Sequence, residues 1–223
     1  MIQTIEATPD EIYDIELEHS LLEANAELAK KNRALLDANG VKAIDVMGAI
    51  GSGKTTLIGC IVSRLKDRLG VAVFNGDATT STDANLIAKD VPVVQIATIN
   101  GCHLDANLVG KALQKIDLQN LKLILIENIG NLICPAEFPL GSKARVVVVS
   151  VTEGQYTVKK HPHMFLGADV VVINKIDLAG AMDVSVDDLT RDVHTLKPDI
   201  KVIPTSCKDG TGVDALLEVL TAL

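Results

Sequence analysis

The chain has 223 residues, 48% of them hydrophobic and 2% aromatic, which is enough for one α/β domain with an aliphatic core. A formal net charge of −8 without a basic block argues against nucleic acid as the main partner. The acidic N-terminus lacks the apolar segment of a signal peptide, and no apolar run is long enough to span a bilayer, so we expect a cytoplasmic protein with no membrane partner.

The first forty residues predict a helix. Leucines recur at helical spacing between residues 9 and 39, the other face is charged, and Gly40 is a natural C-terminal stop. We therefore expect an N-terminal helical extension over residues 1–40, packed on a domain that occupies residues 41–223.

Strand-like and helix-like segments then alternate to the end of the chain. Several of the strand-like segments, such as "KLILIEN" and "DVVVINK", are continuous apolar runs, which is typical of strands buried on both faces. The alternation predicts a doubly wound, mostly parallel sheet with helices on both faces. The expected strands cover residues 42–47, 71–77, 91–98, 122–128, 145–151, 169–175 and 201–206, and the expected helices cover 54–69, 83–89, 103–116 and 212–223.

The segment "GAIGSGKTT" fits the phosphate-binding pattern G-x-x-x-x-G-K-[ST], between an expected strand and an expected helix. Glycines let backbone N–H groups close around phosphate oxygens, and the helix N-terminus adds its positive dipole end. Lys54 is expected to reach the β- and γ-phosphates, and the Thr55 hydroxyl is expected to bind Mg²⁺. The motif predicts a P-loop NTPase fold whose nucleotide site includes Gly48, Gly51, Ser52, Gly53, Lys54, Thr55 and Thr56.

The segment "NKID" at the end of a later strand matches the N-K-x-D element of GTP-binding proteins. A buried Asp177 carboxylate would accept hydrogen bonds from guanine N1–H and the 2-amino group, a donor pair that adenine lacks. The segment "TSCKDG" after the last strand resembles the companion S-A-K loop. Together they predict GTP as the substrate, bound through Asn174, Lys175, Asp177, Ser206, Cys207 and Lys208.

Two carboxylates end strands on the phosphate side, Asp77 and Glu127. Either can hold Mg²⁺, directly or through water, or orient the attacking water. With Lys54 and Thr55 they form the expected catalytic set. Asp77 is also a natural turn residue, and Asp83 is also a natural N-cap for a short helix.

The segment "INGCHLDANLV" sets Cys102 beside His103 at an expected helix start. A helix N-terminus favours the thiolate, and sulfur with imidazole suits Zn²⁺ or Ni²⁺ rather than Mg²⁺. From these residues alone, a metal site and an inert buried thiol with a chance neighbour remain equally open. The pair His161 and His163 is a second metal candidate, for which a surface loop is the simpler interpretation.

The order of "GCHLDA", "ENIGNLICPAEF", "VTEGQYTVKKHP" and "NKIDLA" after a P-loop resembles the HypB family, the nickel-insertion GTPases of hydrogenase maturation. The resemblance covers the chain from about residue 16 to the end. It implies a GTP-dependent homodimer, a P-loop GTPase domain over residues 41–223, and a hydrogenase large-subunit precursor and a partner nickel chaperone as further partners. It implies a Ni²⁺ or Zn²⁺ site made by Cys102, His103 and Cys134. It also implies magnesium and phosphate roles for Lys54, Thr55, Glu127 and Asp77. Finally, it implies that Lys160 reaches the nucleotide of the other subunit, with Asp83 near it.

The chain also departs from the family pattern. Asn100 stands where the family often has lysine, and Gln155 and Tyr156 replace an acidic pair. No Cys-rich or His-rich tract is present, so nickel storage is not expected.

Three other functions compete with nickel insertion for hydrogenase. A urease-type nickel accessory GTPase is disfavoured because its metal motif is usually C-P-H, whereas this chain has "CHL" and a separate "CPA". A small-molecule kinase is disfavoured by "NKID", since most such kinases use ATP. The third is a GTP-binding regulatory module that delivers no metal.

Overall fold

The computed structural model describes residues 2–6, 18–76, 85, 87–98 and 101–223. Within them, eight strands form one sheet in the order β1-β4-β3-β5-β2-β6-β7-β8, and every neighbouring pair is parallel. The predicted doubly wound sheet is confirmed. The strands are β1 Ile2–Glu6, β2 Lys42–Gly48, β3 Val71–Asn75, β4 Val93–Ala97, β5 Leu123–Glu127, β6 Ala144–Ser150, β7 Val170–Asn174 and β8 Lys201–Pro204.

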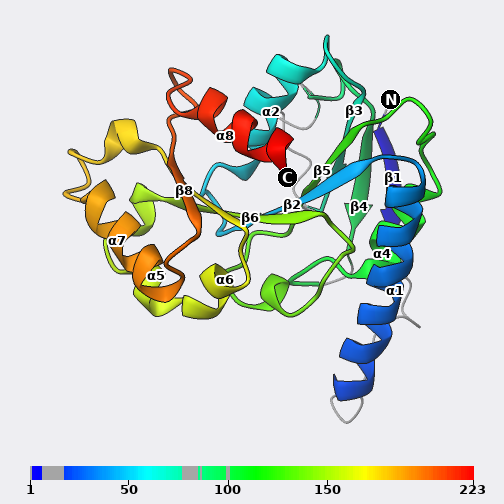
Figure 1. The fold of residues 1–223 in the computed structure, drawn as a ribbon, viewed down its shortest axis with the longest axis horizontal. Coiled ribbons are helices and arrows are strands. Elements are labelled where there is room, and N and C mark those ends of the chain that lie inside the picture. The colour runs from blue at the N-terminus through cyan, green and yellow to red at the C-terminus, as the bar shows by residue number, and fades with distance from the viewer. Residues whose placement is uncertain (1, 7–17, 77–84, 86, 99–100) are drawn as a thin grey trace.

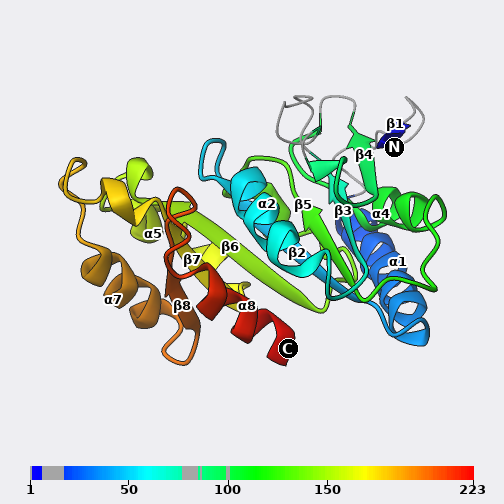
Figure 2. The same ribbon diagram turned by 90° about the horizontal axis from the view of Figure 1, so that it is seen from above.

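Helices cover both faces of this sheet (Figures 1 and 2). Those on one face are α2 and α8, and those on the other are α1, α4, α6 and α7. The α-helices are α1 Glu18–Ala38, α2 Lys54–Leu65, α4 Ala106–Leu113, α5 Thr157–Lys160, α6 Pro162–Leu166, α7 Val186–Leu196 and α8 Val213–Ala222. The 3-10 turns are η3 Cys134–Ala136, η4 Val151–Glu153 and η5 Ile176–Leu178.

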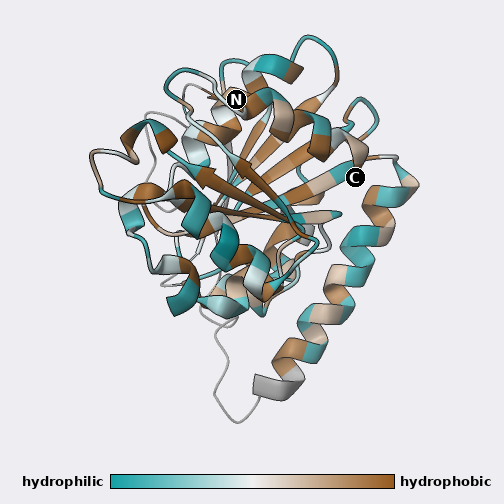
Figure 3. Cartoon of the chain, turned by 60° about the vertical axis from the view of Figure 1, so that its left-hand side comes forward, coloured by the Kyte–Doolittle hydropathy of each residue, from teal (hydrophilic) through white to brown (hydrophobic). Residues whose placement is uncertain are grey.

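The core is built from the apolar strands, which Figure 3 shows as brown ribbons enclosed by the helices. Alternate residues of β2 point to opposite faces, because side chains in a strand alternate. Ile44 packs with the buried side of α2, whereas Met47 packs with residues of α6 and α7. Burial on both faces explains why these strands read as continuous apolar runs in the sequence.

The site is positioned by the central strand β2, which lies between β5 and β6. The chain leaves β2 toward β3 on one side and later returns to add β6, β7 and β8 on the other. Loops after strands on either side of such a reversal form a crevice at the carboxyl edge, where α/β proteins bind ligands. At this edge the P-loop leaves β2, Glu127 is the last residue of β5, and "NKID" begins at the last residue of β7.

The N-terminal region differs from the expectation of a purely helical segment. Residues Ile2–Glu6 form β1, which extends the sheet by pairing in parallel with β4. Helix α1 begins at Glu18 within the described residues, while residues 7–17 lie outside them. The division of the chain at residue 40 stays a prediction.

Two asparagines fasten α1 to the domain. Asn32 Nδ2 donates to the backbone oxygens of Ala106 (2.7 Å) and Leu140 (3.1 Å), and Asn32 is buried. Asn25 Oδ1 accepts from the backbone N–H of Ala106 at 2.7 Å. Helix α1 therefore satisfies the first residue of α4, the helix that follows the Cys-His segment.

Beneath the carboxyl edge, the carboxylate of Asp45 on β2 is wholly buried. Asn128 Nδ2 donates to its Oδ1 at 3.1 Å, and its Oδ2 accepts no hydrogen bond from the described residues. Burial raises the pKa of Asp45 to about 6, against the weaker opposing effects of Asn128 and Arg145.

The predicted element boundaries need trimming by a few residues, most clearly for the helices expected over 54–69 and 103–116. The segment "KKHPHMF", expected to be a surface loop, forms the two short helices α5 and α6. Among the described residues, no helix is both long and apolar enough to cross a membrane.

We predict that Asn32→Ala lowers the free energy of unfolding by about 1–3 kcal/mol, because two buried carbonyls lose their donor. The measurement is urea unfolding followed by circular dichroism. The exposed Lys31→Ala on the same helix is the control and should change stability by less than about 0.5 kcal/mol. Equal effects of the two substitutions would contradict the assigned role of Asn32.

We predict that Asp45 makes the protein less stable as the pH rises from about 4 to 6. Its pKa is higher in the fold than in the unfolded chain, so the native state binds more protons in this window. Between pH 5 and 7 the native protein should lose about 1 kcal/mol that Asp45→Asn does not lose. Unfolding curves at both pH values check this, with the exposed Asp67→Asn as control; a native-like pH dependence in Asp45→Asn would contradict it.

Candidate nucleotide and metal site

The P-loop connects the end of β2 to the start of α2 at Lys54. Gly48 must be glycine here, because an added Cβ would lie 2.2 Å from the backbone oxygen of Val148. Gly51 and Gly53 have φ angles of 79° and 95°, in the region that favours glycine. The glycines predicted from the motif are therefore required by the backbone path of the loop.

The ammonium of Lys54 lies against the loop that precedes it. Lys54 Nζ donates to the backbone oxygens of Gly48 (3.2 Å) and Ala49 (3.0 Å), and the residue is buried. The charge is thus held beside the glycine turn whose N–H groups are expected to surround phosphate. Ser52 is buried in the same loop, and Thr56 is exposed.

The hydroxyl of Thr55 meets the carboxylate at the end of β5. Thr55 Oγ1 donates to Glu127 Oε1 at 2.5 Å, and Glu127 is 1% exposed. A hydroxyl and a carboxylate oxygen are hard ligands of the kind that Mg²⁺ prefers, so this pair fits a magnesium ion. Asp77 and Asp83, predicted nearby, lie outside the described residues.

The predicted base-recognition residues are hydrogen-bonded to the P-loop. Asn174 Nδ2 donates to the backbone oxygen of Ser52 at 2.9 Å, and Lys175 Nζ donates to that of Gly51 at 2.6 Å. Lys175 also adopts a positive φ of 61°, which turns the chain into η5. The phosphate and base elements are therefore parts of one hydrogen-bonded unit.

Asp177 is exposed in η5, and not buried as the sequence analysis assumed. In the neighbouring "TSCK" loop Ser206 is buried and Lys208 is exposed. Burial and the neighbouring Cys60 raise the pKa of Cys207 to about 12, so its thiol is neutral. Asp177 and Lys208 are therefore accessible in the predicted base-recognition loops, whereas Ser206 is buried.

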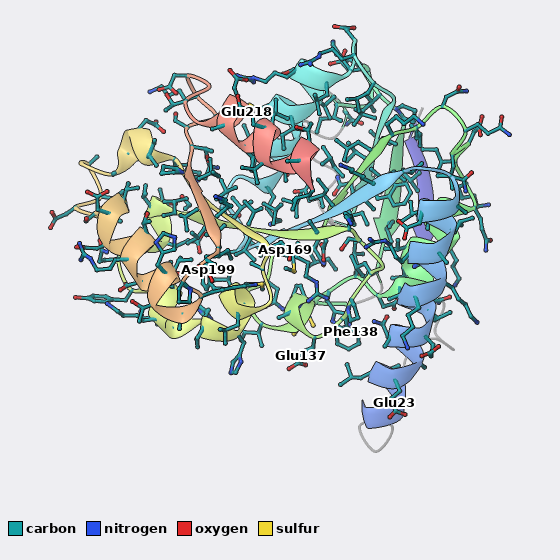
Figure 4. All side chains as sticks on the ribbon, viewed as in Figure 1. Glu23, Glu137, Phe138, Asp169, Asp199 and Glu218 are labelled. Carbon is teal, nitrogen blue, oxygen red and sulfur yellow. The ribbon has the colours of Figure 1, made fainter. Side chains whose placement is uncertain are left out.

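Three soft ligands converge beside this unit. The ligand atoms of Cys102, His103 and Cys134 all lie within 4.8 Å of one another, and no other cluster of this kind occurs among the described residues. Cys102 Sγ is 3.4 Å from His103 Nδ1. The imidazole stacks on Phe138, labelled in Figure 4, with ring centroids 3.8 Å apart.

The expected helix start at the Cys-His pair is wrong. Helix α4 begins at Ala106, and its N-cap is Asp105, whose side chain accepts from Leu108 N at 2.8 Å. Cys102 therefore does not stand at a helix N-terminus, and burial and the nearby Cys134 raise the pKa of its thiol. The metal itself must favour the thiolate, as a coordinated divalent ion does.

Burial lowers the pKa of His103, which favours the neutral imidazole that binds metals. His161 and His163, the second metal candidates, belong to no such cluster. The cluster of Cys102, His103 and Cys134 is therefore the place in the described chain with the chemistry for Ni²⁺ or Zn²⁺.

Sequence reasoning missed Asn128, which lies directly after Glu127. Its Oδ1 accepts from the N–H groups of Leu104 (3.1 Å) and Ile129 (3.0 Å), while its Nδ2 donates to Asp45. Leu104 follows His103, so Asn128 supports the backbone of the Cys-His segment. The available signal was a polar residue in "ENIG" directly after a buried strand.

The departures from the family pattern lie elsewhere. Gln155 holds the backbone of Ser185, accepting from its N–H at 2.7 Å and donating to its oxygen at 3.4 Å. Ser185 caps α7, so the amide has a structural partner that explains its presence. Lys160 is exposed at the end of α5, and Asn100 lies outside the described residues.

Comparison with known proteins identifies the family. The model described as "CobW/HypB/UreG, nucleotide-binding domain" matches residues 42–204. The chain is 45% identical over 207 residues to the probable hydrogenase maturation factor HypB of Methanocaldococcus jannaschii, covering 92% of this chain and 94% of that protein.

Two crystal structures share the fold closely. HypB from Archaeoglobus fulgidus has a TM-score of 0.86 and 39% identity, covering 90% of this chain and 98% of that one. HypB from Helicobacter pylori in complex with nickel has a TM-score of 0.84 and 31% identity, covering 89% and 94%. With its P-loop and base elements joined beside a Cys-His-Cys cluster, the chain belongs to the HypB family of hydrogenase maturation factors.

Proposed function

We propose that this chain is a GTP-hydrolysing metallochaperone, which binds nickel in a GTP-dependent homodimer and releases it during [NiFe]-hydrogenase maturation. One observation carries the proposal. The cluster of Cys102, His103 and Cys134 lies beside the segment that follows Glu127, and Glu127 is hydrogen-bonded to Thr55 of the P-loop. The segment from Glu127 to Cys134 thus connects the nucleotide-binding loop to the Cys-His-Cys cluster.

The nucleotide site is proposed to bind GTP with its phosphates in the P-loop and guanine against Asp177. Lys54 supplies positive charge to the β- and γ-phosphates, and Thr55 with Glu127 holds Mg²⁺. When bound there, Mg²⁺ would neutralise charge that develops on the phosphate oxygens as the γ-phosphoryl group is transferred to water. Glu127 or Asp77 orients that water.

The metal is cargo in this proposal. Cys102, His103 and Cys134 supply three ligands of one subunit, which leaves a four-coordinate site incomplete. A second copy related by a two-fold axis can supply the rest, so that dimerisation raises metal affinity. Nickel is the proposed ion because the structure of the Helicobacter pylori relative contains nickel. Zinc is the alternative ion, since it prefers the same ligands.

The proposed dimer uses the surface around the P-loop. Ile50 in the loop is 82% exposed, and Ile133, next to Cys134, is 65% exposed. Apolar side chains this exposed are suited to burial against a second copy. Lys160 is proposed to reach the nucleotide of the partner subunit.

The recipients are proposed to be the hydrogenase large-subunit precursor and a partner nickel chaperone, in the cytoplasm. Residues 41–223 act as the GTPase domain, and residues 1–40 as an extension whose strand and helix pack on it. A regulatory GTP-binding module is the competing outcome, favoured if loss of Cys102 leaves metal delivery unchanged.

We predict that Asp177→Asn removes the preference for guanine. The native protein should bind GDP at least about tenfold more tightly than ADP, since one unmet pair of hydrogen bonds costs more than about 1.4 kcal/mol. The variant should lose that preference and gain affinity for XDP, whose 2-oxo group accepts from an amide. Calorimetric titration measures all three nucleotides.

The control is Asp187→Asn, an exposed change in the first turn of α7, which should keep guanine preference. Gain of XDP binding separates lost recognition from general damage. Equal affinity of the native protein for ADP and GDP would contradict the assignment of Asp177.

We predict that nickel binds through Cys102 more tightly in the GTP-bound dimer. The expected ratio of nickel affinities between a non-hydrolysable GTP analogue and GDP is about 5- to 150-fold, the usual size of such coupling. Nickel titration with both nucleotides measures the ratio, and sedimentation velocity gives the oligomeric state.

Cys102→Ala should lose nickel affinity in both nucleotide states. Cys60 lies on α2, outside the cluster, so Cys60→Ala should keep the native nickel affinities. Equal nickel affinity of the native protein in both nucleotide states would rule out gating. Native-like nickel binding by Cys102→Ala would move the site elsewhere, with His161 and His163 tested next.

A further inference from the structure

Asn131 lies where the P-loop and both segments of the metal cluster meet. Its backbone N–H donates to the backbone oxygen of Gly48 at 3.1 Å, and the two residues form an isolated antiparallel bridge. Gly48 is the last residue of β2 and the first glycine of the P-loop motif. The main chain of Asn131 is therefore attached to the start of the nucleotide-binding loop.

The side chain of Asn131 is attached to the metal segments. Its Nδ2 donates to the backbone oxygen of Cys102 at 3.2 Å. Its Oδ1 accepts from the backbone N–H of Ile133, the residue before Cys134, at 2.9 Å. The two partners require a donor on one side and an acceptor on the other, so an amide is the group that suits this position.

The Gly48 oxygen has a second partner, because Lys54 Nζ also donates to it at 3.2 Å. One carbonyl thus carries both the lysine expected to bind phosphate and the backbone of Asn131. When Lys54 moves toward the phosphates of a nucleotide, its hydrogen bond to Gly48 is exchanged for a stronger charge-assisted one. The Gly48 oxygen also accepts from Asn131, so a change in its hydrogen bond to Lys54 bears directly on the Gly48–Asn131 bridge.

Asn128 has a different task, although it also supports the Cys-His segment. It is fully buried and bonded to the buried Asp45 within the sheet. Asn131 is partly exposed, and its side chain joins surface segments only. Of the two asparagines, Asn131 is the one that can shift without opening the core.

We propose that Asn131 is a positioning residue that couples the nucleotide state of the P-loop to the geometry of the metal cluster. Its backbone follows Gly48, and its amide sets where Cys102 and Cys134 lie relative to each other. This inference rests on the proposed function, since it concerns how the nucleotide controls metal affinity. Asn131 touches neither nucleotide nor metal in this role.

The test compares the native protein with Asn131→Ser. Serine can still accept from the N–H two residues on, so the turn before Cys134 is kept, but serine is too short to reach the Cys102 oxygen. The measured quantity is the ratio of nickel dissociation constants with GDP and with a non-hydrolysable GTP analogue. The thermal midpoint and the rate of GTP hydrolysis are measured on the same samples.

The native ratio should lie at about 5- to 150-fold, and Asn131→Ser should reduce it to within about twofold of unity. Nickel affinity with GDP and the hydrolysis rate should stay within about threefold of native, because the ligands and Lys54 are unchanged. By reciprocity, nickel should no longer tighten binding of the GTP analogue in the variant. Asn120→Ser, on an exposed turn away from the site, should keep the native ratio.

Asn131→Asp is the second variant, used if the serine variant unfolds at lower temperature. Aspartate keeps the acceptor for Ile133 and loses the donor to Cys102, so it should reduce the ratio as serine does.

If the native protein shows the expected ratio of nickel dissociation constants and a folded Asn131 variant shows the same ratio, this inference is overturned and the proposed function stays intact. Loss of nickel binding with both nucleotides also overturns it, since Asn131 would then only build the site. A native ratio of one overturns the gating function and this inference together.

Discussion

The hydrogen bond between Thr55 and Glu127 is the contact on which the rest of the site depends. It exists because β2 and β5 are adjacent parallel strands, in a register that pairs Val46 with Glu127. Both strands therefore end at the same edge, one entering the P-loop and the other entering the segment that leads to Cys134. A different strand between β2 and β5 would separate the P-loop from the segment that carries Cys134.

The buried polar groups beneath this contact are arranged to hold it. Asp45, Asn128 and the backbone of Leu104 form a connected set inside an otherwise aliphatic core. Such a set is costly to bury and is stable only when most of its groups are bonded. Burial of the Asp45 carboxylate is unfavourable and raises its pKa to about 6, whereas the amide oxygen and the amide nitrogen of Asn128 are both hydrogen-bonded. The Cys-His segment is therefore hydrogen-bonded, through the backbone of Leu104, to a buried side chain of the core.

Features of the fold and the site that depend on neighbouring residues could be predicted from the sequence, whereas features that depend on contacts between distant segments could not. The P-loop and "NKID" can be recognised from the sequence because the residues of each motif are close together in the chain. Their positions at strand ends follow from the apolar runs before them. Strand β1 was missed because its pairing with β4 joins residues about ninety positions apart, and its five residues, IQTIE, are too short a run to stand out beside the acidic residues that follow. The helix start after Cys102 was misplaced because Asp105, three residues later, is the better N-cap. The partners of Asn128 and Asn131 could not be predicted, since each depends on which loops the sheet order brings together.

The protonation of Cys102 bears on the proposed role of releasing a metal. Burial raises the pKa of Cys102, so at neutral pH a metal ion must displace a proton from that sulfur before it binds. The proton competes with the metal, and the described residues of one chain bring three ligands together, so under the proposed function a monomer holds nickel weakly. A storage protein would need the opposite arrangement, with deprotonated thiolates and a closed ligand set. In the proposed dimer the second subunit completes the ligand set, so the metal site would open when the two subunits separate.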